Sequence, residues 1–206
     1  FSYFDSTDAC AERDDLHEEI KESIISTVDE FSEHLEENDE IVIHSYKRIG
    51  DGQRRAADKL REKFNLKVTL MHLDMSSQFE IFDTGNSSFL ANSGLFIETG
   101  SSQGLLNASG HEVSENRGGN ASSRPIWIKG EGNTTNFKKN VEDIYSLCYM
   151  DWRDQFGGSS PITMSYPKEI ANKIQKADQL QSQGHLNIEV ENLGTSGNLR
   201  RLPWFI

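Results

Sequence analysis

The chain has 206 residues, a formal net charge of −12 and an apolar fraction of 35%. This length fits one domain or slightly more, and no apolar run reaches the roughly 18 residues that a membrane helix needs, so no membrane span is expected. The acidity is uneven, because residues 1–40 hold 15 acidic and 2 basic residues whereas residues 47–67 hold eight lysines and arginines. A phosphate-binding surface needs only a local basic patch, so nucleic acid is not excluded as a ligand. A solvated helix face is the alternative explanation of such a patch.

The ends and the cysteines suggest the setting of the chain. It begins at Phe1 without a methionine or a signal-peptide pattern, which suggests a fragment of a longer protein. Cys10 and Cys148 are far apart and lack metal-ligand spacing. Two reduced thiols are typical of a cytoplasmic protein, and we expect that location.

The first half alternates predicted helices with apolar strands. An acidic helix is predicted over residues 16–37, because its apolar residues recur every three or four positions and Asp15 with Glu18 forms a candidate capping pair. Further elements follow in the order strand 41–43, helix 52–64 ending at Asn65, and strand 68–73. This order predicts an α/β layer in which these strands run parallel.

The second half opens with a different composition. Residues 84–123 are rich in Gly, Ser and Asn, and apolar pieces at 88–90 and 95–97 predict small strands joined by turns. Residues 118–120 form either a phosphate-binding nest or a plain surface turn. The remaining predictions are strand 126–129, helix 135–154, strand 160–166, helix 167–183, and an apolar end that packs back on the body.

Several of these pieces together resemble one known family. Ser122-Ser123-Arg124-Pro125 is a small basic turn that leads into a strand, and residues 160–166 form a proline-punctuated segment before the last helix. With the acidic helix and the strand Ile41-Val42-Ile43-His44, they resemble, in order and approximate spacing, the C-terminal part of the PIWI domain of Argonaute proteins, and prokaryotic ones in particular.

The resemblance implies a fold and a domain assignment. The fold is α/β and RNase-H-like, a mixed sheet flanked by helices, and N-terminally truncated because the strand with the first catalytic aspartate would precede Phe1. Residues 1–206 would form one partial PIWI domain. Its parts are the acidic helix 16–37, the hairpin region 84–123, and the C-terminal helices and apolar tail 134–206.

The same resemblance bears on catalysis. PIWI domains cut phosphodiester bonds with carboxylates that hold two divalent metal ions. The second catalytic aspartate falls at Tyr46 or Lys47, and neither side chain can bridge two metals. Weak catalytic candidates are Glu12, Asp51 and Lys168. An N-cap is the alternative role for Asp51. The resemblance therefore implies a catalytically inactive domain of the kind found in short prokaryotic Argonautes.

Contacts to the nucleic acid are implied more strongly than cutting. The resemblance implies that side-chain hydroxyls and cations contact the backbone phosphates of a guide and its target. Arginine suits this role because its planar guanidinium binds two phosphate oxygens at once. Arginine and lysine on the helices have alternative roles as helix-dipole partners or solvated residues. The Ile206 carboxylate would help a metal ion such as Mg²⁺ bind the guide 5′ phosphate beside a MID domain. The nucleic-acid-binding candidates are Ser122, Ser123, Arg124, Arg153, Tyr166 and Lys168.

Three hypotheses about function follow. The first is an inactive PIWI domain that binds a guide–target duplex through its backbone, in a role such as prokaryotic defence. The second is an active, metal-dependent, guide-directed endonuclease. The third is a protein-interaction module whose acidic helix or long helix docks an effector protein.

Overall fold

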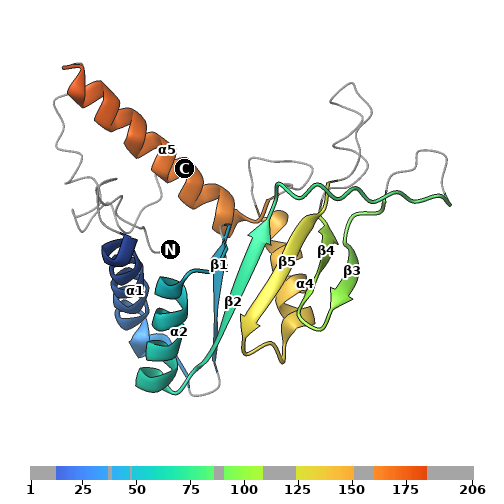
Figure 1. Ribbon diagram of the computed structural model, residues 1–206, viewed down its shortest axis with the longest axis horizontal. Coiled ribbons are helices and arrows are strands. Elements are labelled where there is room, and N and C mark those ends of the chain that lie inside the picture. The colour runs from blue at the N-terminus through green and yellow to red at the C-terminus, as the bar shows by residue number, and fades with distance from the viewer. Residues whose placement is uncertain are drawn as a thin grey trace.

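A computed structural model of the chain describes residues 13–36, 39–46, 48–85, 91–108, 124–150 and 160–184. Its centre is a five-stranded sheet with strand order β1-β2-β5-β4-β3 (Figure 1). β1 and β2 run parallel, as predicted for the first half, and the other neighbouring pairs run antiparallel. The predicted mixed sheet is therefore confirmed. The strands are β1 Glu40–Ser45, β2 Lys67–Asp74, β3 Leu95–Gly100, β4 Gln103–Asn107 and β5 Ile126–Gly132.

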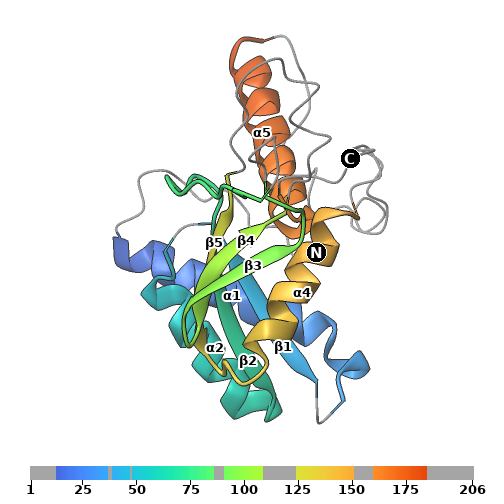
Figure 2. The ribbon, with the colours of Figure 1, turned by 90° about the vertical axis from the view of Figure 1, so that its right-hand side faces the viewer.

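Helices flank both faces of the sheet. Val68 and Leu70 of β2 face the core under α1 and α2, whereas Met71 and Leu73 face the core under α4. Figure 2 shows α1 and α2 behind the sheet and α4 in front of it. This division follows from the alternation of side chains along a strand. None of the helices that the structure describes is long and apolar enough to cross a membrane. The helices are α1 Arg13–Glu30, the 3₁₀ turn η1 Ser32–His34, α2 Asp51–Phe64, α4 Phe137–Cys148 and α5 Ile162–Ser182.

The acidic helix α1 differs from its prediction at both ends. It already includes Arg13, so the predicted capping pair is wrong: Asp15 lies inside the helix, and Glu18 accepts a hydrogen bond from Lys21. It also ends at residue 30 rather than 37. Its apolar stripe is confirmed in part: Ile24 is buried in the core that α1 shares with α2, with Ile20 and Val28 packed against it, whereas Phe31 lies after the helix and is 49% exposed.

The helix predicted over 52–64 is confirmed as α2, which begins one residue earlier. Asn65 ends it in the left-handed conformation, with φ of 52°, and its N–H donates to the Arg61 carbonyl. Asparagine tolerates this conformation better than most residues, which explains why the helix stops there.

The strand predicted over 160–166 is wrong, because this segment forms the start of α5. Pro161 occupies the N-cap in extended conformation, and its carbonyl accepts hydrogen bonds from Met164 N at 2.8 Å and Ser165 N at 3.1 Å. Pro167 lies inside the helix, where a missing N–H removes one hydrogen bond. The helix continues because its other turns retain theirs.

The rest of the second half matches its prediction in part. The apolar piece 95–97 lies in β3, which forms a hairpin with β4, and the strand predicted over 126–129 lies in β5. α4 is shorter than the predicted helix 135–154, although Val141, Ile144 and Cys148 are buried as expected. The predicted strand 88–90, the turn 118–120 and the apolar end lie outside the described residues.

Candidate nucleic-acid interface

The parallel strands β1 and β2 end at the same edge of the sheet, which we call the carboxyl edge. β5 begins there, because Asp74 at the end of β2 lies opposite Trp127 near the start of β5. α5 also begins there, since Thr163 contacts His44 near the end of β1. Figure 1 shows these strand ends close to the start of α5. Residues distant in the sequence therefore meet at this edge.

On the α4 face of the sheet, a histidine connects β1 to α5. The His44 Nδ1 atom lies 2.8 Å from the Thr163 hydroxyl oxygen, within hydrogen-bonding distance. Burial lowers the pKa of His44 to about 4, although the Asp143 carboxylate acts in the opposite direction. The imidazole is therefore neutral near pH 7. The Ser165 Oγ is also buried here and has no hydrogen-bond partner among the described residues.

On the opposite face, a second histidine marks the end of β2. His72 is 7% exposed, and its ring lies edge-on to Trp127 with centroids 5.9 Å apart. Burial lowers the pKa of His72, while the Asp74 charge and a hydrogen bond to the Tyr46 backbone raise it. The Arg48 charge lowers this pKa further. These effects show that the segment after β1 and the end of β2 lie around the same imidazole.

The turn before β5 holds the principal predicted binding residue. Pro125 is fully buried, and its carbonyl accepts a hydrogen bond from the Ser77 hydroxyl at 2.7 Å. Arg124, directly before it, is exposed and makes no ion pair with a described carboxylate. The turn is thus held to the loop after β2, and the guanidinium is available to a ligand.

The two binding candidates on α5 differ in exposure. Tyr166 is 9% exposed and forms part of the packed start of the helix. Lys168 is exposed two residues later. Of these two side chains, the lysine is therefore the better placed to reach a phosphate.

Asp51, the weak catalytic candidate after β1, is the first residue of α2. Its alternative role as N-cap is wrong, because Gly50 occupies that position and its N–H donates to Gln53 Oε1 at 2.9 Å. The exposed Asp51 carboxylate instead accepts a hydrogen bond from Arg54 at 3.2 Å. A carboxylate in the first helical turn also complements the helix dipole.

The carboxyl edge does not fit a pair of divalent metal ions with the side chains that the structure describes. Tyr46, one of the two residues at which the resemblance places the aspartate, directly follows β1, and the His44 Nδ1 atom lies within hydrogen-bonding distance of Thr163. No group of three His, Cys, Asp or Glu side chains in the described ranges could hold a metal ion. The remaining predicted site residues lie outside those ranges: Glu12, Lys47, Ser122, Ser123, Arg153 and Ile206.

The sequence reasoning missed His44, Thr163, His72 and Trp127 as members of this edge. The sequence did contain a signal for the two histidines. Each lies near the end of an apolar strand, at a position where an apolar core side chain is expected. The pairing of His44 with Thr163 was hidden, since residues 160–166 were predicted as a strand.

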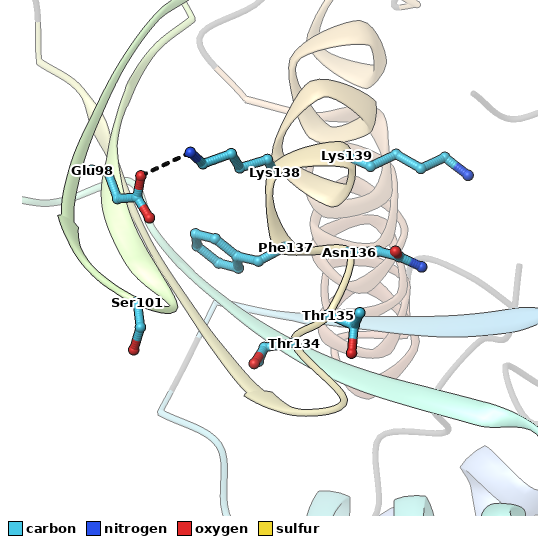
Figure 3. Close-up of a pocket in the computed structure, with 8 residues that line it drawn as sticks. All are labelled: Glu98, Ser101, Thr134, Thr135, Asn136, Phe137, Lys138 and Lys139. Atoms are coloured by element: carbon cyan, nitrogen blue, oxygen red, sulfur yellow. Dashed lines mark ion pairs between the residues drawn. The ribbon is translucent and has the colours of Figure 1, made fainter.

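One pocket, of about 340 Å³, lies away from the carboxyl edge, between the β3–β4 hairpin and the start of α4. Glu98 and Lys138 form an ion pair of 3.1 Å across it, and Lys139 points away (Figure 3). This pocket contains none of the predicted site residues.

The chain matches no family model and no curated protein. It is similar in fold to solved structures of Argonaute proteins. For Argonaute from Aquifex aeolicus, the TM-score is 0.61 at 16% identity, covering 79% of this chain and 22% of that one. For Argonaute from Clostridium butyricum bound to a guide DNA and a 19-mer target DNA, the TM-score is 0.59 at 19% identity, covering 79% and 21%. The chain thus spans about a fifth of these proteins, and the likeness establishes the fold.

Proposed function

We propose that this chain is the C-terminal part of the PIWI domain of a prokaryotic Argonaute and binds a guide strand and its target through the phosphate backbone. The observation that carries the proposal is the exposed Arg124 on an anchored turn, in a fold similar to that of an Argonaute solved with guide and target DNA. Backbone contacts of this kind fix the position of a duplex without reading its sequence.

We further propose that the domain does not cut. Support comes from Tyr46 and Lys47, since neither residue at the expected aspartate position is a carboxylate, and from His44, which is neutral near pH 7 and hydrogen-bonded to Thr163. Hard cations prefer carboxylate and other oxygen ligands, and phosphodiester cleavage by two metals needs several such groups. A Mg²⁺ ion at the guide 5′ phosphate, held with the Ile206 carboxylate and a MID domain, and a cytoplasmic location remain parts of the proposal.

The proposal is tested by measuring the affinity of the intact protein for a guide–target duplex. Arg124→Ala is expected to weaken binding by roughly ten- to a hundredfold, because a hydrogen bond to a charged group contributes roughly 1.5–3 kcal/mol. Arg55→Ala is the matched control, since Arg55 is an exposed arginine on α2. Equal affinities of the two variants would refute the role of Arg124.

Protein docking is the second candidate function, and the shape of α5 favours it. Figure 1 shows α5 extending away from the sheet, and its described side chains from residue 171 onward are exposed. Among the described residues the packing contacts of α5 come from its first turns, and a helix with such an exposed remainder is suited to contact another protein or domain. Loss of an effector or MID contact on substitution of Leu180, with nucleic-acid binding retained, would support this function.

A further inference from the structure

We propose that the carboxyl edge also binds unpaired nucleotides, whose bases stack on three exposed aromatic side chains: Tyr46, Phe79 and Phe82. This inference rests on the proposed function and adds the form of nucleic acid that the edge accepts. We call these three side chains the aromatic ridge. They are 61%, 56% and 58% exposed, which is more than any other described aromatic residue.

The ridge follows the ends of both parallel strands. Tyr46 comes directly after β1, and its backbone contacts His72 near the end of β2. Phe79 comes two residues after Ser77, which is hydrogen-bonded to Pro125 at the start of β5. In Figure 1 the segment 75–85 runs along the upper edge of the sheet, past the start of β5. The three rings therefore belong to one edge.

The exposure of Phe79 and Phe82 is built into the fold. Ile81, between them, is buried with Ala91 and Leu105, and Trp127 packs against this cluster. The segment is thus anchored to the sheet while the rings on either side face solvent. A largely exposed phenylalanine forgoes much of the free energy of its burial, so two exposed rings on an anchored segment suggest a surface with a ligand.

The charges favour nucleic acid over an apolar protein surface. Arg48 lies two residues after Tyr46, and Arg124 directly precedes Pro125, which is hydrogen-bonded to Ser77. Both arginines are exposed, and neither forms an ion pair with a carboxylate that the structure describes. Glu80 and Asp83, the two acidic residues within segment 75–85, both have interactions within the protein. Exposed aromatic rings together with arginines can contact the bases and the phosphates of a single strand, because every base offers a face for stacking.

A binding assay with the intact protein tests the inference. Its probes are a labelled single-stranded oligonucleotide of mixed sequence, an abasic strand of the same length, and a duplex. The double variant Phe79→Ala/Phe82→Ala is expected to weaken single-strand binding by roughly tenfold or more and to leave duplex binding within about twofold. The abasic strand should bind weakly to the unmodified protein.

Two further variants make the test specific. Phe31→Ala removes a ring that is 49% exposed but lies between α1 and η1, and it should change nothing. Phe79→Leu/Phe82→Leu keeps the surface apolar without the rings, and it should lose single-strand binding as the alanine pair does. Circular dichroism checks that each variant is folded.

The outcomes separate this inference from the proposed function. If Phe79→Ala/Phe82→Ala leaves both the single-strand affinity and the duplex affinity unchanged, the role of the aromatic ridge is refuted, while the proposed function is not. Full binding by the leucine pair would also overturn the role of the ridge and would indicate an apolar docking surface for a protein. No binding of either the strand or the duplex by the unmodified protein would overturn the proposed function as well.

Discussion

Acid is expected to destabilise the fold through His44, which connects β1 to α5. The pKa of this histidine falls from 6.5 to about 4 in the folded chain because the imidazole is buried. As the pH falls below 6.5, the unfolded chain binds a proton that the folded chain does not. Stability due to the neutral ring is therefore complete above pH 6.5 and is lost as the pH falls towards 4.

The size of this effect follows from the two pKa values. One pKa unit corresponds to about 1.4 kcal/mol, so the full loss is about 3 kcal/mol, of which about 2 kcal/mol is already lost at pH 5. His44→Gln removes the titrating group and keeps a side chain that can hydrogen-bond to Thr163. Relative to His44→Gln, the free energy of unfolding of the unmodified protein should therefore fall by about 2 kcal/mol by pH 5 and by about 3 kcal/mol in full.

The assay is urea unfolding of both proteins at pH 7.5, 6, 5 and 4.5, with His34→Gln as the control for an exposed histidine. Carboxylates also titrate in this range, but they do so in all three proteins and cancel in the difference. If the difference in the free energy of unfolding between His44→Gln and the unmodified protein stays constant with pH, the lowered pKa of His44 is refuted. A pH-dependent change in the His34 variant of the same size would refute its assignment to His44.

Two other substitutions test the packing around the edge and the hairpin. Gly104→Ala should lower stability by about 1–3 kcal/mol, because the added Cβ would clash with the Phe96 ring and lie 2.7 Å from the Ile97 carbonyl oxygen. An unchanged melting temperature would contradict this. Ser77→Ala should lower the free energy of unfolding by about 1–3 kcal/mol, because the buried Pro125 carbonyl loses its hydrogen-bond donor. It should also weaken duplex binding, because the turn that carries Arg124 is no longer held. Normal stability in urea together with normal affinity would contradict both expectations.

Local periodicity predicted the helices and strands with regular patterns. The apolar stripe through Ile24 predicted α1, and Asn65 predicted the end of α2. The apolar run through Val68 predicted β2. These signals depend on neighbouring residues along the chain. They could be read without knowing where distant segments lie.

The start of α5 could not be predicted in the same way. Ile162 and Thr163 favour a strand locally, and Pro167 disfavours a helix. Tertiary contacts decide the outcome, because Met164 packs in the core under α4 and Thr163 meets His44. The burial of Tyr166 and the exposure of Arg124 likewise depend on the assembled sheet.

The central claim is that the intact protein carries guide nucleic acid, and the most direct measurement is to purify it from its own cells, extract the bound nucleic acid and sequence it. We expect short strands of uniform length with a 5′ phosphate, and their amount should fall in Arg124→Ala but not in Arg55→Ala. Folded protein that carries no nucleic acid above the level of an unrelated control protein would contradict the claim.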